Sequence, residues 1–257
     1  MRAGDYWVHI EGDGPPLVLL HGFAGSHMTW LPHLPIFSRY LQVIAPDLPG
    51  HGDTTAQRFQ MNEAADDLVA ALAALGISRF HLLGYSMGGR LALYLATYHL
   101  DRVQSLILES ASPGLSSPDE RRARAERDEQ LAQDIERDGL AAFVSRWERL
   151  PLFATQTDAM RDAVRPIRLG QTAAGLAASL RGMGTGVQPS LWDHLAAVEA
   201  PTLLIAGELD AKYAAIARQM AAALPKARVE IVQGAGHTVH LERPAVFQRL
   251  VLSHLTI

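Results

Sequence analysis

Two patterns of apolar and polar positions alternate along most of the 257-residue chain. Short continuous apolar runs are typical of strands buried on both faces, and longer segments with apolar residues three or four apart are typical of amphipathic helices. A strictly alternating segment at residues 6–11 predicts a strand at the edge of a sheet. The apolar runs predict further strands at residues 17–20, 43–45, 81–83, 105–109, 202–206 and 228–232.

Helical segments separate these strands. The clearest are residues 64–75, 213–223 and 244–255, together with a segment that ends at Tyr98. This order predicts parallel βαβ units with right-handed crossovers, and hence an α/β fold whose mostly parallel sheet is flanked by helices. Ligands of such sheets bind beyond the carboxyl ends of the strands.

The alternation stops between residues 113 and 195, where the chain is rich in charges and has helical patterns such as residues 120–137. We therefore expect a core formed by residues 1–112 and 196–257, with residues 113–195 inserted as a helical lid over the rim of the sheet.

Composition narrows the class of protein. An apolar fraction of 48% is ample for the buried core of one α/β domain. The formal net charge of −4 gives no basic footprint for nucleic acid. The absence of cysteine removes disulfides, thiolate metal sites and cysteine nucleophiles, and is typical of a reducing compartment.

No segment predicts contact with a membrane. The first residues carry charges without a continuous apolar stretch, and the most apolar segment, residues 82–98, is interrupted by Arg90 and by glycines. We expect a soluble cytoplasmic protein without membrane insertion. The pattern makes no prediction about its oligomeric state.

Candidate chemistry begins at Ser86, which lies between a predicted strand and a predicted helix in the sequence Gly84-Tyr85-Ser86-Met87-Gly88. This is the G-x-S-x-G pattern of a nucleophile elbow, in which small residues allow a sharp turn that exposes the serine hydroxyl. The alternative is a glycine-rich loop that only reverses the chain.

A serine hydroxyl needs a neighbouring base, and His237 is the best candidate for it. His237 follows the predicted strand at residues 228–232 in the sequence Gly-Ala-Gly-His, at the same rim as Ser86. The alternative histidine is His240.

The base needs a carboxylate that orients it. Asp210 follows the strand at residues 202–206, and the order Ser86, Asp210, His237 is the order of α/β-hydrolases. Glu109, which ends the strand at residues 105–109, and Glu208 are the alternatives.

Two backbone N–H groups are needed to stabilise a developing oxyanion. In this arrangement one comes from Met87, the residue after the serine. The other comes from the loop after the strand at residues 17–20, where Phe23 is the candidate.

Three arginines are candidates for binding anionic groups. Arg90 lies one helical turn after Ser86, and Arg124 shares a predicted inward helix face with Asp128. Arg168 continues the spacing of Arg161 and Arg165. Each of them also fits a solvated helix face or a structural ion pair. Together they favour a substrate with more than one carboxylate.

The motifs of the chain resemble the α/β-hydrolase superfamily, and within it the 2-succinyl-6-hydroxy-2,4-cyclohexadiene-1-carboxylate synthases (MenH family) of menaquinone biosynthesis. The rim motifs HGF, DLPGHG and GAGH are common to the superfamily. The segments that match the family are GYSMGGR, SPGL (112–115), RRAR (121–124) with Asp128, Trp147 before PLFA (151–154), GLAASLRGMGTGVQPSLW (175–192), GELDAKY and GHTVHLERP. The elbow and the GH motif are generic to the fold, and the lid segments are much more specific.

The resemblance implies a lyase that eliminates pyruvate from an enolpyruvyl cyclohexene polycarboxylate. It implies that Ser86, His237 and Asp210 act as the base, that the Phe23 and Met87 N–H groups stabilise an enolate, and that no metal or organic cofactor takes part. The substrate-binding positions that it implies are Tyr85, Arg90, Arg124, Trp147 and Arg168. The alternative is a serine hydrolase, a carboxylesterase or a C–C bond hydrolase, that acts on an acidic substrate.

Overall fold

The computed structural model describes residues 1–256, which contain one eight-stranded sheet in the order β1-β2-β4-β3-β5-β6-β7-β8. β2 pairs antiparallel with β1 and β4, and all other neighbours are parallel. The strands are β1 (Arg2–Ala3), β2 (Tyr6–Glu11), β3 (Pro16–Leu20), β4 (Gln42–Pro46), β5 (Phe80–Tyr85), β6 (Val103–Glu109), β7 (Thr202–Gly207) and β8 (Ala227–Val232).

The predicted mostly parallel α/β sheet is confirmed, with one correction at its edge. Residues 6–11 form β2, but the edge position belongs to β1, which pairs outside it. A strand of two residues is too short to produce a hydrophobic period, so the sequence pattern could not reveal β1.

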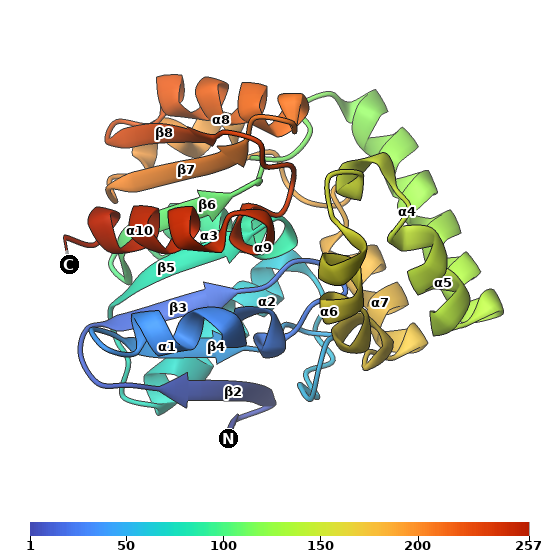
Figure 1. The fold of residues 1–257 in the computed structure, drawn as a ribbon, viewed down its shortest axis with the longest axis horizontal. Helices are drawn as coiled ribbons and strands as arrows, with labels where there is room; N and C mark the ends of the chain where they lie inside the picture. The colour runs from blue at the N-terminus through green and yellow to red at the C-terminus, as the bar shows by residue number, and fades with distance from the viewer. Residues whose placement is uncertain (257) are drawn as a thin grey trace.

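Helices cover both faces of the sheet (Figure 1). On one face, α2 (Met61–Ala74), α3 (Met87–Tyr98) and α8 (Ala211–Ala223) pack in the larger apolar core. On the other face, α1 (Leu34–Phe37) and α10 (Pro244–His254) pack in a second core around Trp30 and Phe247. The central strands β3 to β7 are therefore buried on both faces, which explains their continuous apolar runs.

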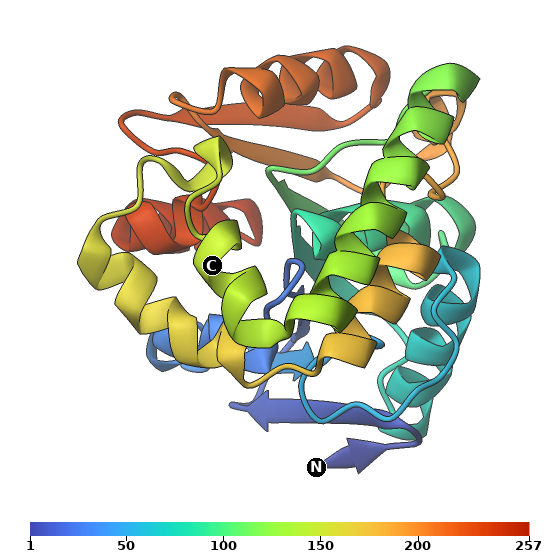
Figure 2. The same cartoon turned by 90° about the vertical axis from the view of Figure 1, so that its right-hand side faces the viewer.

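Residues 113–195 contain helices and no strand. Figure 2 shows these helices in front of the carboxyl ends of the strands. We call α4, α5, α6 and α7 with their connections the helical cover. Its helices are α4 (Pro118–Asp138), α5 (Leu140–Trp147), α6 (Asp158–Leu169) and α7 (Ala173–Met183), and the remaining short helices of the chain are η1 (His27–His33), η2 (Pro151–Phe153), η3 (Trp192–Ala197) and α9 (Val239–Glu242).

The cover has its own apolar core, formed mainly by α4, α5 and α7. Ser117 caps α4 by accepting a hydrogen bond from the Glu120 N–H, and α4 ends at Gly139, whose φ is +80°. The expected boundary at residue 195 falls inside η3. Leu195 of η3, and Leu191 just before it, belong to the larger apolar core. The division at residues 113 and 195 stays a prediction.

None of the helices in residues 1–256 is long and apolar enough to cross a membrane.

Two buried histidines make stability depend on pH. Burial lowers the pKa of both His33 and His51 to about 3, well below the ordinary value of about 6.5. Between these values the unfolded chain binds protons that the folded protein does not, so the stability present above pH 6.5 is lost as the pH falls. At pH 5 each histidine should lower the free energy of unfolding by roughly 2 kcal/mol.

Urea unfolding at pH 7.5 and pH 5 measures this loss. His33→Leu should reduce the loss by about the contribution of one histidine, because His33 is buried against Trp30 and Phe247, where an apolar side chain can replace it. A loss that is unchanged in His33→Leu would contradict the assignment.

Candidate active site

Ser86 lies in the sharp turn between β5 and α3 and has a φ of +51°. Few non-glycine residues adopt this region, and holding one there costs about 1–3 kcal/mol. Glycines make the turn possible, because a Cβ at Gly84 would meet the backbone of Gly88, and a Cβ at Gly88 would overlap the carbonyl oxygens of Leu20 and His21. The strain and the close packing are those of a nucleophile elbow.

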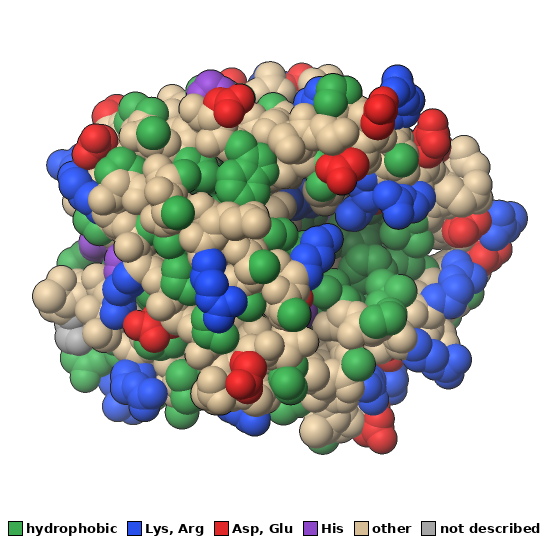
Figure 3. Space-filling view, turned by 90° about the horizontal axis from the view of Figure 1, so that it is seen from above, with side chains coloured by type: hydrophobic (Ala, Val, Ile, Leu, Met, Phe, Trp, Pro, Cys, Tyr) green, Lys and Arg blue, Asp and Glu red, His purple; other side chains and the backbone are tan. Residues whose placement is uncertain are grey.

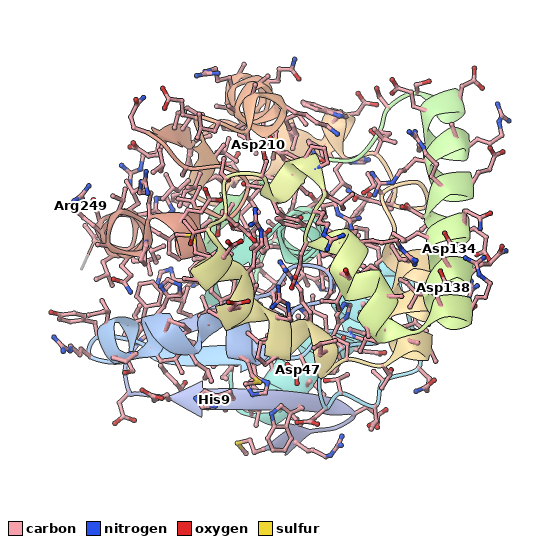
Figure 4. The ribbon with its side chains drawn as sticks, turned by 45° about the vertical axis from the view of Figure 1, so that its right-hand side comes forward. His9, Asp47, Asp134, Asp138, Asp210 and Arg249 are labelled. Atoms are coloured by element: carbon pink, nitrogen blue, oxygen red, sulfur yellow. The ribbon has the colours of Figure 1, made fainter. Side chains whose placement is uncertain are left out.

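His237 and Asp210 are brought to Ser86 from two later strands. The His237 Nε2 lies 3.2 Å from the Ser86 Oγ, and its Nδ1 lies 2.6 Å from the Asp210 Oδ2. Asp210 begins α8 at the junction of the sheet and the cover (Figure 4). The three side chains thus have the hydrogen-bond order of a Ser-His-Asp triad.

The alternative candidates have other partners. The buried Glu109 accepts hydrogen bonds from the backbone N–H and the Nδ1 of His240, both through contacts of 2.9–3.0 Å. Glu208 accepts one from the Gly234 N–H. Glu109 and His240 therefore form a second buried pair beside Tyr85, whose ring centroid lies 4.7 Å from that of His240.

The ring of Tyr213 packs against the ring of His237. The two ring centroids are 4.7 Å apart in an edge-on arrangement, and the Tyr213 N–H donates to the Asp210 Oδ1. Asp210 thus caps α8 with one oxygen and contacts His237 with the other, which fixes the orientation of the imidazole.

Two buried histidines hold the loop that carries Phe23. The Leu48 N–H donates to the His21 Nε2, and the Ala24 N–H donates to the His51 Nε2. The loop therefore keeps its shape without its own secondary structure. Phe23 and Met87 both line the cavity at Ser86, as the predicted oxyanion site requires, but the role of their N–H groups stays a prediction.

A cavity of about 220 Å³ lies between Ser86 and the helical cover. Seen from above in Figure 3, the surface is hollowed on the cover side, with hydrophobic side chains inside and Lys or Arg side chains beside them. Among residues 1–256, three cationic side chains line the cavity, those of Arg90, Arg124 and Lys212, and no carboxylate does. Acids of the cover such as Asp134 and Asp138 lie on the outer side of α4 (Figure 4).

The arginines differ in how they are held. Arg90 is half-buried, and its removal from water lowers its pKa to about 10, so it is still a cation near neutral pH. The Arg124 Nε donates to the Asp128 Oδ1 at 2.7 Å, which is the partner that the helix spacing predicted. Arg168 is only 8% exposed and pairs with Glu148 at 3.2 Å, so the solvated helix face is wrong for it.

Arg168 lies in a smaller neighbouring cavity of about 50 Å³. Its guanidinium lies 5.2 Å from the centre of the Phe153 ring. Tyr85, Trp147, Phe23 and Phe153 line both cavities, so the two form adjoining compartments. The structure therefore brings all ten predicted site residues to one region, with Arg168 one compartment away from Ser86.

Several lining residues were not predicted from the sequence. Lys212 and Tyr213 follow Asp210 directly in the GELDAKY motif, and that adjacency was the available signal. The others come from distant elements. Those at residues 152–153 and 179–185 lie in segments that match the family motifs, but the motifs gave no role to single positions: Leu131, Leu152, Phe153, Ser179, Leu180, Met183, Gly184 and Thr185.

The sheet order, the strained serine and the partners of His237 define an α/β-hydrolase. The family model described as alpha/beta hydrolase fold matches residues 15–244.

Close relatives share one name. An Enterobacter sp. enzyme named 2-succinyl-6-hydroxy-2,4-cyclohexadiene-1-carboxylate synthase is 36% identical, over 90% of this chain and 88% of its own. A Bacillus subtilis protein given the same name provisionally is 44% identical, over 96% and 94%. The structure of MenH from S. aureus superposes with a TM-score of 0.92 at 34% identity, covering 98% of both chains. The chain belongs to the 2-succinyl-6-hydroxy-2,4-cyclohexadiene-1-carboxylate synthase family.

Proposed function

We propose that the protein is a lyase that eliminates pyruvate from 2-succinyl-5-enolpyruvyl-6-hydroxy-3-cyclohexene-1-carboxylate. The product is 2-succinyl-6-hydroxy-2,4-cyclohexadiene-1-carboxylate, an intermediate of menaquinone biosynthesis. One observation carries the proposal beyond family membership: within residues 1–256, the cavity beside Ser86 is lined by three cations and by no carboxylate. A substrate with three carboxylates complements such a cavity, whereas a neutral ester leaves the charge of Arg90 without a counter-ion.

The bond changes of the reaction follow from comparing the chemical structures of this substrate and product. A base removes the proton from C2, next to the succinyl carbonyl, and that carbonyl takes up the charge as an enolate. The electron pair then forms the C2–C3 double bond, the ring double bond moves from C3–C4 to C4–C5, and the C5–oxygen bond breaks. The leaving group departs as the enolate of pyruvate and takes up a proton.

The base in this proposal is the Ser86 hydroxyl together with His237. His237 accepts the proton through its Nε2, and Asp210 stabilises the imidazolium that forms. The Phe23 and Met87 N–H groups stabilise the enolate, and such donors contribute about 3 kcal/mol each. A base and these donors supply all that the elimination needs, so the proposal includes neither a metal nor an organic cofactor.

Binding is assigned to Arg90, Arg124 and Arg168, which anchor carboxylates, and to Tyr85 and Trp147, which line both compartments. Residues 113–195 act in this proposal as a lid, because the cover supplies Arg124, Trp147 and Arg168. Its helices separate the reaction from bulk water and strengthen the electrostatic contacts.

The direct test supplies the purified protein with the enolpyruvyl substrate. Pyruvate, followed with lactate dehydrogenase, and the absorbance of the conjugated diene should rise together in a one-to-one ratio. Release of pyruvate without the diene would contradict elimination. Hydrolysis of acidic esters without any release of pyruvate would favour the serine hydrolase.

A further inference from the structure

The three arginines that face the cavities have different partners. Arg124 pairs with Asp128, and Arg168 pairs with Glu148, so a carboxylate of the protein already balances each of these charges. Within residues 1–256, no carboxylate lies within ion-pair distance of Arg90. Arg90 is therefore the arginine of the larger cavity whose charge stays available to a ligand.

Neutral oxygens hold Arg90 instead. Its Nη1 donates to the carbonyl oxygen of Met183 at 2.7 Å and to the Oε1 of Gln188 at 2.8 Å. Both acceptors orient the guanidinium without neutralising it. Even a half-buried cation without a counter-ion loses part of its hydration, and a bound anion compensates for that loss.

The amide of Gln188 is fixed in place. Gln188 is fully buried, and its backbone N–H donates to the Gly184 carbonyl. The loop from Gly184 to Gln188 packs directly on α4. The approach is so close that a Cβ at Gly186 would overlap the backbone nitrogen of Ala125. The Gln188 side chain in turn lies against Gly114, where a Cβ would come within 3.1 Å of its Nε2.

The orientation of this amide is explained by Arg90 alone. The Nε2 of Gln188 is buried and has no hydrogen-bond partner within the described part of the chain. An amide flipped by 180° would place its NH2 group against the guanidinium, where two donors repel each other. The amide thus leaves both N–H donors of its Nε2 unsatisfied, at a cost of about 1–3 kcal/mol for such a buried group, to keep its oxygen on Arg90.

We propose that Gln188 is a positioning residue that aims Arg90 at a carboxylate of the substrate while leaving its charge uncompensated. A glutamate of the same shape would form an ion pair with Arg90 and compete with the substrate, and an apolar side chain would leave Arg90 less well aimed. Gln188 therefore sets the preference of the site for an anionic group at this point. This inference rests on the proposed function, whose substrate supplies the carboxylate.

The test compares Gln188→Glu, Gln188→Met and the unchanged protein in the pyruvate-release assay. We expect Gln188→Glu to raise KM at least tenfold and to leave kcat within about threefold, since the substituted carboxylate weakens the ground state and the transition state alike. Gln188→Met should raise KM by a smaller factor. The matched control is Gln171→Glu, because the side chain of Gln171 is also buried but bonds to the backbone of Gly52 and Ile167 rather than to an arginine of the site.

A second readout separates positioning from a merely structural role. Gln188→Glu supplies the counter-ion that Arg90 lacks, so the ligand-free variant should unfold at the same temperature as the unchanged protein or a few degrees higher. A residue needed only for packing would lower the unfolding temperature and reduce kcat. If Gln188→Glu does not fold, Gln188→Met must still raise KM.

Succinate binding, measured by calorimetry, distinguishes failure of this inference from failure of the proposed function. If no pyruvate is released but Gln188→Glu weakens succinate binding at least tenfold, the proposed reaction fails and the role of Gln188 stands. Equal KM values and equal succinate affinities in Gln188→Glu and the unchanged protein would overturn the inference, as would the absence of any binding of succinate or substrate.

Discussion

Replacing Ser86 by alanine is expected to lower kcat for pyruvate release by about 10²–10⁴-fold, the usual contribution of a positioned base. The hydroxyl lies 3.2 Å from the His237 Nε2 at the floor of the cationic cavity. Without it, His237 has to reach the C2 proton across the space that the hydroxyl occupied. KM should change little, because the carboxylates bind to arginines that the substitution leaves in place.

The matched control for this experiment is Ser110→Ala. Ser110 also follows a strand, has a φ of +48° and is buried, but it lines neither of the two cavities. It should keep kcat within about threefold of the unchanged protein, as expected for a side chain outside the site. A Ser86→Ala enzyme with kcat within tenfold of normal would show that Ser86 is not part of the base.

The second large effect is expected for Arg90→Ala, which should reduce kcat/KM for the tricarboxylate by about 10²–10³-fold. A hydrogen bond between a buried guanidinium and a carboxylate contributes about 3 kcal/mol when it is well aimed. Hydrolysis of a neutral nitrophenyl ester, if present, should fall by less than threefold, because that ester has no carboxylate for Arg90. Arg124→Ala should change both rates in the same direction but by less, since Asp128 already shares the charge of Arg124.

Arg181→Ala is the control for loss of an arginine from the cover. Arg181 pairs with Glu129 and Glu136 on the exposed side of α4 and lies outside both cavities that adjoin Ser86. It should keep the kcat/KM of the tricarboxylate, because surface ion pairs contribute about 1 kcal/mol or less. Equal losses of tricarboxylate and ester turnover in Arg90→Ala would contradict both the lyase proposal and the role of Arg90.

Most of the fold could be predicted from local sequence patterns. Each central strand is buried on both faces, so a short apolar run was enough to find it, and the order of strands and helices then placed Ser86, Asp210 and His237 at one rim. The same reasoning misplaced the edge of the sheet, because β1 has only two residues. Motifs that resemble the family supplied the candidate substrate and the lid positions.

Distant contacts decided the rest of the site. Glu109 and His240 were plausible members of the triad until the structure showed them bound to each other, 131 positions apart in the chain. Arg168 lies on α6 and Arg90 lies on α3, and no sequence pattern relates the two positions. Only the fold places Arg168 in the compartment that adjoins the cavity of Arg90, paired with Glu148. Gln188 reaches Arg90 across 98 positions, and no periodicity links the two.

The sequence by itself thus determined the α/β class, the elbow at Ser86 and the order of its partners, because burial of strands and helix faces leaves a period that neighbouring residues share. Only the tertiary structure decided which charges remain unpaired. The packing of α3, α4 and the loop before η3 brings only neutral oxygens of residues 1–256 within hydrogen-bond distance of Arg90, so its charge stays free. The charges of Arg124 and Arg168 are balanced by carboxylates. The contact that fixes Arg90 has no local signature, since it joins positions 98 apart in the chain.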